Sequence, residues 1–183
     1  MYRDPVQSLE APSFQAPVAM RPLRVGLIGI GTVGAGTLRV LARNQALIAG
    51  RAGRGIEVVV VAARNLARAE GVVGADIALT NDPMQVATHP KVDVVVEAAG
   101  GTGPAREWVL AAIAAGKHVV TANKALLAVH GSEIFAAARA QGVAVAYEGA
   151  VAVSIPIVKA LREGLTANRI EWVAGIINGT TNF

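Results

Sequence analysis

The sequence predicts an α/β fold in which a doubly wound parallel sheet is followed by the beginning of an α+β domain. Between residues 21 and 147, short apolar stretches rich in valine alternate repeatedly with helical patterns, and no repeat or low-complexity segment interrupts them. After residue 148 this alternation stops. Because right-handed strand–helix–strand units build a parallel sheet with helices on both faces, we expect a sheet domain at 21–147 and the start of a second domain at 148–183.

The composition is that of a globular protein with ample core material. Of the 183 residues, 53% are hydrophobic and 16% are charged, so most of the chain is too apolar to be disordered. The net charge of +4 is modest and forms no basic stripe, which is compatible with an anionic cofactor and not with a nucleic-acid partner. The absence of cysteine excludes a disulfide scaffold, a thiolate metal site and a cysteine nucleophile.

The first residues of the chain do not fit the sheet domain. Residues 1–20 carry Pro5, Pro12 and Pro17 among scattered polar residues and lack the apolar core of a secretion signal. We therefore expect a flexible tail at 1–20. No apolar run in the sequence is long enough to cross a bilayer, so we expect a cytoplasmic protein without a membrane partner.

The first strand and the first helix are joined by a glycine-rich turn. The apolar run 23–28 is typical of a buried parallel strand, and Gly29-Ile-Gly31-Thr-Val-Gly34 follows it directly. A strand, this glycine spacing and then a helix form the first unit of a Rossmann-like dinucleotide-binding fold. Gly29 would allow a tight turn, Gly31 would let a pyrophosphate approach the backbone, and Gly34 would let the helix pack closely.

The same turn would place phosphate at the start of a helix. The unpaired amides and the positive dipole end of that helix suit an anion. The alternative is a strand–helix turn with accidental glycines. The cofactor-binding residues predicted for the turn are Gly29, Ile30, Gly31, Thr32, Val33 and Gly34.

The second strand, at 56–63, is rich in β-branched residues and ends next to a basic residue. Domains that prefer NAD usually place an acidic residue at this point, where it binds the ribose hydroxyls. Here the chain has Arg64. An arginine binds a 2′-phosphate that a carboxylate would repel, so we favour NADP over NAD as the cofactor. The alternative is a solvated loop arginine with Arg68 on the next turn.

Helical and irregular segments fill the space around these strands. The apolar spacing over 38–48 predicts one helix that ends at the glycine-rich loop 50–55. Residues 66–90 are expected to hold a helix and an irregular connection; Asp82-Pro83 marks a helix start and His89-Pro90 marks its end.

The third strand, at 91–97, runs into a second glycine-rich turn at 98–104. Open α/β sheets bind ligands at the carboxyl ends of their strands, where this turn would lie. Thr102 has two equally weighted interpretations, as a hydrogen-bond donor to the cofactor or as the N-cap of a helix that contains Pro104.

Lys124 is the strongest catalytic candidate from its position. It ends the segment 117–124, predicted as a strand and its exit loop, on the sheet edge expected to hold both glycine turns. We expect flanking apolar segments to desolvate its amine partly, which suits an acid or base; the alternative is a solvated loop lysine. A helix expected to open at Gly131-Ser132 and end at Gly142 is followed by a strand at 143–147.

The second domain is expected to begin with a small-residue turn. Residues 149–156 form this turn, a helix follows, and a strand is expected at 170–177. Glu148 precedes a run of backbone carbonyls, so it is either part of a hard-cation site or, more commonly for such a position, a capped or paired carboxylate.

Several segments together resemble homoserine dehydrogenase, in order and in spacing. These segments are Gly29-Ile-Gly31-Thr-Val-Gly34, Val120-Thr-Ala-Asn-Lys124-Ala-Leu-Leu-Ala128, Glu148-Gly-Ala-Val-Ala-Val-Ser-Ile-Pro156, Leu161-Arg-Glu-Gly-Leu165 and Gly175-Ile-Ile-Asn-Gly-Thr-Thr-Asn182. The resemblance implies NADP- or NAD-dependent interconversion of L-homoserine and L-aspartate 4-semialdehyde, in the biosynthesis of threonine, methionine and isoleucine. It also implies a homodimer when the protein is full length.

The resemblance also assigns residue roles. It places Lys124 beside the nicotinamide and the substrate, as a participant in proton transfer, and Arg64 near the 2′-phosphate. It implies that Gly179 and Thr180 lie on the substrate side. A sodium site built mostly from backbone oxygen is implied at Glu148, Val151, Val153 and Ile155.

Two features depart from the family pattern. The chain has Ala152-Val153-Ser154 where the family often has Ala-Gly-Gly, which would stiffen the cation turn. The family's second active-site lysine and its substrate-binding acids would lie beyond Phe183, so we expect an N-terminal part that binds NADP but is inactive alone. The alternatives are a non-catalytic NADP-binding module and a dehydrogenase for a related amino-acid aldehyde.

Overall fold

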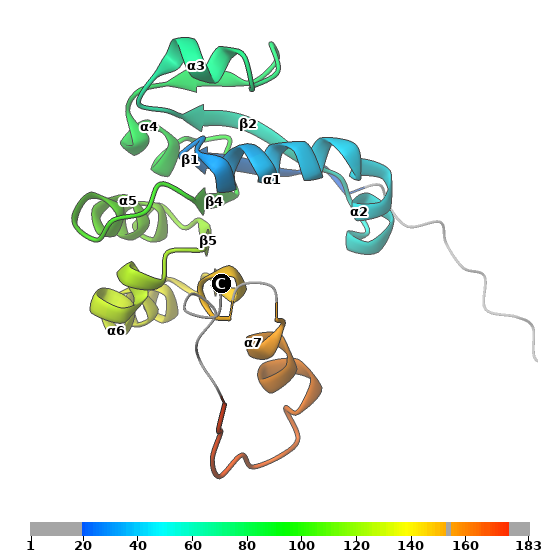
Figure 1. Ribbon diagram of the computed structural model, residues 1–183, viewed down its shortest axis with the longest axis vertical. Coiled ribbons are helices and arrows are strands. Elements are labelled where there is room, and N and C mark those ends of the chain that lie inside the picture. Colours follow the sequence, from blue (N-terminus) through cyan, green and yellow to red (C-terminus); the bar gives the residue numbers. More distant parts are fainter. Residues whose placement is uncertain (1–19, 153–154, 176–183) are drawn as a thin grey trace, which may run out of the picture.

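The structure is a computed structural model that describes residues 20–152 and 155–175 (Figure 1). Its centre is a six-stranded sheet with the strand order β3-β2-β1-β4-β5-β6, in which every neighbouring pair is parallel. This order reverses direction between β1 and β4, so the predicted doubly wound parallel sheet is confirmed. The strands are β1 (Leu23–Ile28), β2 (Ile56–Ala62), β3 (Ala78–Thr80), β4 (Val94–Glu97), β5 (His118–Thr121) and β6 (Val145–Ala146).

Helices cover both faces of the sheet. Figure 1 shows α5 and α6 on one side and α1 on the other. Two buried clusters correspond to these faces, one that joins the strands to α4, α5 and α6 and one that joins them to α1 and α3. The helices are α1 (Thr32–Arg43), α2 (Gln45–Ala52), α3 (Leu66–Glu70), α4 (Pro83–Ala87), α5 (Gly103–Ala114), α6 (Lys124–Gln141) and α7 (Ile157–Lys159).

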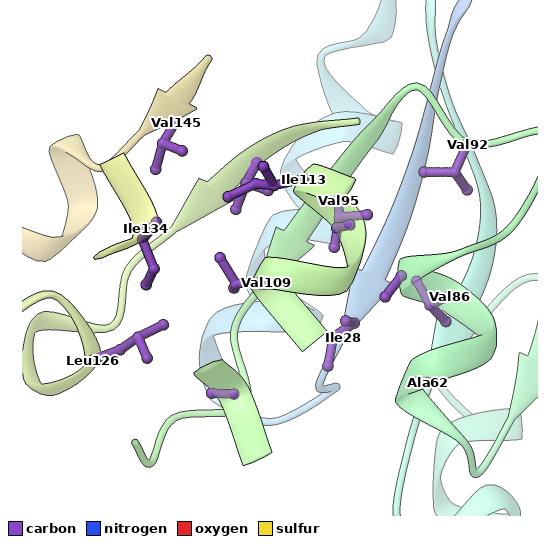
Figure 2. Close-up of a cluster of buried hydrophobic side chains, with 14 of the residues drawn as sticks. Ile28, Ala62, Val86, Val92, Val95, Val109, Ile113, Leu126, Ile134 and Val145 are labelled. Atoms are coloured by element: carbon purple, nitrogen blue, oxygen red, sulfur yellow. The ribbon is translucent and has the colours of Figure 1, made fainter. Parts of the chain in front are cut away.

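The larger cluster is built from valine, isoleucine, leucine and alanine side chains (Figure 2). Val95 of β4, Val109 of α5 and Leu126 of α6 are all completely buried. Burial of each such side chain contributes about 1.5–3 kcal/mol, so the helices are held mainly by this apolar contact. The central strands β1 and β4 are largely buried, as expected in a parallel sheet, whereas β5 leaves His118 and Val120 exposed.

Two polar contacts fix the amino-terminal edge of the sheet. The carboxylate of Asp93 accepts two hydrogen bonds from the Arg21 guanidinium, at 2.7 and 2.8 Å, and a third from the backbone amide of Arg24. Lys117 is buried, and its amine donates to the carbonyls of His89 and Val92 at 2.6 and 2.8 Å. Burial lowers the pKa of the Lys117 amine below its ordinary value. Lys117 and His89 therefore contribute to the framework of the fold.

Helix α6 begins earlier than the sequence indicated. The helix expected from Gly131-Ser132 begins instead at Lys124, because the Asn123 side chain caps it by accepting a hydrogen bond from the amide of Leu126. Gly131 lies inside the helix, where a Cβ would be 3.6 Å from the ring of Phe135. The glycine therefore does not mark the start of α6, and a Cβ at this position would make only ordinary van der Waals contact.

Two further segments differ from expectation between the first and third predicted strands. The single helix expected over 38–48 is divided at Asn44 into α1 and α2. The segment 66–90 contains the additional strand β3, whose three residues are too few to show a periodic pattern. The helix start expected at Asp82-Pro83 is confirmed, since the Asp82 side chain caps α4.

The segment after β6 forms short turns and a short helix. A 3-10 turn at Glu148–Ala150 leads to α7 and then to a π turn at Ala160–Gly164. The strand expected at 170–177 is wrong for its described part: residues 170–175 adopt no regular structure and are exposed. Within the described residues no neighbouring strand pairs with this segment, and Trp172 is 78% exposed.

Candidate functional site

The glycine turn after β1 has the tight geometry that its spacing predicts. Gly29 has φ +98°, and a Cβ there would lie 2.8 Å from the backbone of Ala98 and Ala99. A Cβ on Gly34 would lie 2.0 Å from the carbonyl oxygen of Gly29. Only glycine fits either position, because one needs a positive φ and both need a close backbone approach. The roles expected for Gly29 and Gly34 in the turn are confirmed.

Gly31 is glycine in a different environment. Its φ of −68° is accessible to any residue, and a Cβ there would meet no atom within 4 Å. Gly31 is the N-cap of α1, no side chain caps this helix, and its first turn carries no acidic residue. Thr32 and Val33 are exposed beside it, while Ile30 packs against the smaller buried cluster. The start of α1 therefore presents open backbone where an anionic ligand fits without a clash.

The second wall of the site is the turn after β4, and a buried carboxylate holds it. Glu97 is completely buried, and its Oε1 accepts hydrogen bonds from the amides of Ala99 and Gly100, both at 2.9 Å. Gly100 and Gly101 have φ values of +76° and +81°. The turn therefore combines two left-handed residues with a carboxylate beneath it.

A chain of hydrogen bonds links this turn to the end of β5. The Thr121 hydroxyl donates to Oε2 of Glu97 at 2.7 Å and accepts from the amide of Asn123 at 3.0 Å. The Asn123 amide group in turn donates to the carbonyl of Gly101 at 2.6 Å. Asn123 thus fixes the β4 turn and the start of α6 together.

Sequence reasoning missed Glu97, Thr121 and Asn123. The sequence does contain a signal for Glu97, since an acidic residue that ends a valine run and precedes two glycines needs partners if its strand is buried. Thr102 precedes α5, but its hydroxyl makes no capping hydrogen bond. The capping interpretation of Thr102 is therefore wrong for its side chain, and its contact with a cofactor stays a prediction.

Arg64 and Lys124 lie at the same carboxyl-terminal edge. Arg64 follows β2, the neighbour of β1, and it is exposed together with Arg68. Lys124 is the first residue of α6 and is also exposed, so the partial desolvation expected for its amine is wrong. The structure thus brings the Gly29 turn, the β4 turn, Arg64 and Lys124 to one edge, around the point where the strand order reverses.

Glu148 uses its carboxylate to cap a helix. Its two oxygens accept hydrogen bonds from the amides of Val158 and Lys159, both at 2.9 Å, at the start of α7. The interpretation of Glu148 as a capped carboxylate is therefore confirmed. Among residues 20–152 and 155–175, no group of three or more His, Asp or Glu side chains is placed to hold a metal ion.

The remaining residues predicted for the sodium site and the substrate side are only partly within the described chain. Val151 and Ile155 are exposed at 38% and 61%. Val153, Gly179 and Thr180 lie outside the described residues.

In the described part of the chain, no helix has the length and apolar character needed to span a bilayer.

The comparisons with known proteins point to one family. A family profile described as the NAD binding domain of homoserine dehydrogenase matches residues 29–148, which is most of the chain. This chain belongs to the homoserine dehydrogenase family. A second profile, described as homoserine dehydrogenase, matches residues 156–183.

Individual relatives carry the same family name. A homoserine dehydrogenase from Pseudomonas aeruginosa is 61% identical over 144 residues, which are 79% of this chain and 33% of the relative. One from Methylobacillus glycogenes is 53% identical over 144 residues, or 79% of this chain and 35% of the relative. The chain therefore spans about a third of the length of the curated relatives it matches.

A solved structure agrees with the fold of this homoserine dehydrogenase segment. The crystal structure of a homoserine dehydrogenase from Thiobacillus denitrificans is 62% identical, with a TM-score of 0.84 over 90% of this chain and 38% of that one. The Rossmann-like sheet of the present chain is thus the arrangement found in a solved family member.

Proposed function

We propose that this chain forms the cofactor-binding part of an NADP-preferring homoserine dehydrogenase. The observation that carries the proposal is the Gly29–Gly34 turn, in which two glycines close the backbone and Gly31 leaves it open. The turn lies at the sheet edge where the strand order reverses, which is where open α/β sheets bind dinucleotides. The whole enzyme would interconvert L-homoserine and L-aspartate 4-semialdehyde.

The preference for NADP is proposed from the end of β2. Arg64 is exposed there, and the adjoining residues Ala63 and Asn65 carry no negative charge. Its guanidinium would bind the 2′-phosphate of NADP through charge-assisted hydrogen bonds. NAD has no 2′-phosphate and would not make these hydrogen bonds. NAD would bind at the same place with lower affinity.

The remaining residues of this edge would act on the substrate side. The reduced cofactor, when bound, supplies the hydride that adds to the carbonyl carbon of the aldehyde. Lys124 would orient the reacting oxygen and help to stabilise its developing negative charge, supported by the amino-terminal end of α6. Thr102 would donate a hydrogen bond to the cofactor, and Gly179 and Thr180 would contact the substrate.

Sodium and a second subunit complete the proposal. Glu148 would offer its backbone carbonyl to sodium, because its carboxylate already caps α7. Val151, Val153 and Ile155 would contribute the other backbone oxygens. The whole enzyme would act as a homodimer.

A substitution at Gly31 tests the proposed cofactor site. The Gly31→Val variant should fold normally, because its backbone angles suit any residue and its side chain would enter open space. The valine would occupy the pyrophosphate position, so we expect the dissociation constant for NADP, measured by calorimetry, to rise at least tenfold. The thermal unfolding midpoint without NADP should not change.

Gly36 provides a matched control for this experiment. It lies in α1, and a Cβ there also meets no atom within 4 Å. Gly36→Ala should bind NADP as the wild type does and be slightly more stable, as expected for alanine in a helix. If Gly31→Val binds NADP with the affinity of the wild type, the cofactor does not bind at this turn.

A further inference from the structure

Glu97 is a buried acidic residue without an assigned role in the proposed chemistry. Its carboxylate is completely buried at the end of β4, and its partners among the described residues are two backbone amides and one hydroxyl. All three partners donate, which is the pattern that a carboxylate requires. A buried acid is costly unless it is fully hydrogen-bonded, so this arrangement serves a specific local structure.

The structure held by Glu97 is the wall of the glycine turn. Oε1 binds the amide of Ala99, and the backbone of Ala98 and Ala99 is the surface against which Gly29 packs with no room for a Cβ. A movement of the β4 turn would therefore displace Gly29 and, through it, the start of α1. Gly100, the second residue bound by Oε1, has a positive φ, so the carboxylate also stabilises a left-handed backbone.

The other carboxylate oxygen reaches the end of β5. Through Oε2 it binds Thr121, which fixes the amide of Asn123, and Asn123 caps the helix that begins with Lys124. Asn123 also returns to the β4 turn through the carbonyl of Gly101. One side chain thus connects the backbone beside the proposed phosphate position with the helix that carries the proposed catalytic lysine.

We propose that Glu97 is the positioning residue of this site, and that it sets cofactor affinity by fixing the β4 turn against Gly29. The proposal rests on the proposed dinucleotide site. It assigns Glu97 no contact with the cofactor, since its carboxylate is buried beneath the turn and its hydrogen bonds go to protein groups.

Substitutions at Glu97 and Thr121 test this assignment in the 183-residue chain. Glu97→Ala leaves the amides of Ala99 and Gly100 without an acceptor, so we expect the dissociation constant for NADP to rise about tenfold. Glu97→Gln keeps one oxygen for both amides and should recover most of the affinity. Thr121→Val removes the link to Asn123 and should weaken NADP binding severalfold, which provides a second test if Glu97→Ala does not fold.

Asp93→Asn is the matched control at the opposite end of the same strand. It removes the negative charge and one of the two oxygens that bind Arg21 and Arg24, and should lower the thermal unfolding midpoint while leaving NADP affinity unchanged. If NADP binding weakens equally in Asp93→Asn and Glu97→Ala, a general loss of stability explains the effect of Glu97. That result would contradict the proposal. Unchanged binding in a folded Glu97→Ala or Thr121→Val variant would also contradict it. A wild-type chain that binds no NADP would instead overturn the proposed function on which this inference depends.

Discussion

Gly29 and Gly34 are glycine because the protein leaves no room for a side chain, whereas Gly31 is glycine although the protein itself would tolerate one. Any Cβ on the first two would meet backbone at 2.8 Å or less, while Gly31 faces open space. Because Gly31 is also the N-cap of α1, where no side chain caps the helix, this open space lies beside free backbone amides that a phosphate could approach. This contrast separates the folding role of the motif from its proposed binding role.

At the same scale, we propose that Arg64 sets the preference for NADP over NAD. The Arg64→Ala variant should lose about tenfold or more in affinity for NADP and little in affinity for NAD, because only NADP offers a phosphate to the guanidinium. Isothermal titration with each coenzyme measures both effects. Arg51→Ala, an exposed arginine in α2, serves as the control and should change neither affinity. An equal loss for NADP and NAD in Arg64→Ala would remove this residue from the phosphate site.

At the scale of elements, the strands are predictable from the sequence but the contacts between their ends are not. Apolar runs indicated β1, β2, β4, β5 and β6, because the strands of a parallel sheet are rich in apolar residues. The three-residue β3 is too short for such a signal.

Residues that act across strands show why the site was only partly predictable. Glu97 and Thr121 are 24 positions apart, and their hydrogen bond exists only because β4 and β5 are neighbours. The same applies to the hydrogen bond from Asn123 to the carbonyl of Gly101, whereas its cap on Leu126, which explains why α6 begins at Lys124, is a local contact. The Gly29–Gly34 motif was readable because its glycine spacing lies within six consecutive residues, although Gly29 packs against the distant Ala98 and Ala99.

The anchor of β4 gives a pH-dependent prediction. The hydrogen-bonded Arg21 guanidinium, helped by the Arg24 amide, lowers the pKa of Asp93 from 3.8 to about 2. A carboxyl whose pKa is lower in the folded chain than in the unfolded chain stabilises the folded state at every pH above the unfolded pKa. This stability is lost as the pH falls from about 4 to about 2. Because Arg21 is 62% exposed, we expect the contribution to be only about 1 kcal/mol.

Urea unfolding of the wild type and Asp93→Asn measures this contribution. The variant should be less stable by about 1 kcal/mol at pH 7, and the difference should shrink between pH 4 and pH 2 as the wild-type carboxyl is protonated. A difference that stays constant over this range would show that Asp93 does not act through its charge.

At the scale of the whole molecule, the sheet places its two ends in different roles. The amino-terminal edge is fixed by Asp93 and Lys117 through contacts with Arg21 and with backbone carbonyls. The carboxyl-terminal edge gathers the open Gly31 backbone, the turn held by Glu97 and the exposed Lys124. The topology of a doubly wound sheet thus separates the Asp93 and Lys117 contacts from the edge where the proposed chemistry occurs.

Calorimetric titration of the intact 183-residue chain with NADP tests the central claim most directly. We expect saturable binding with one coenzyme per chain, and tighter binding of NADP than of NAD. The absence of binding heat from both coenzymes at several temperatures, in a chain shown to be folded, would contradict the account.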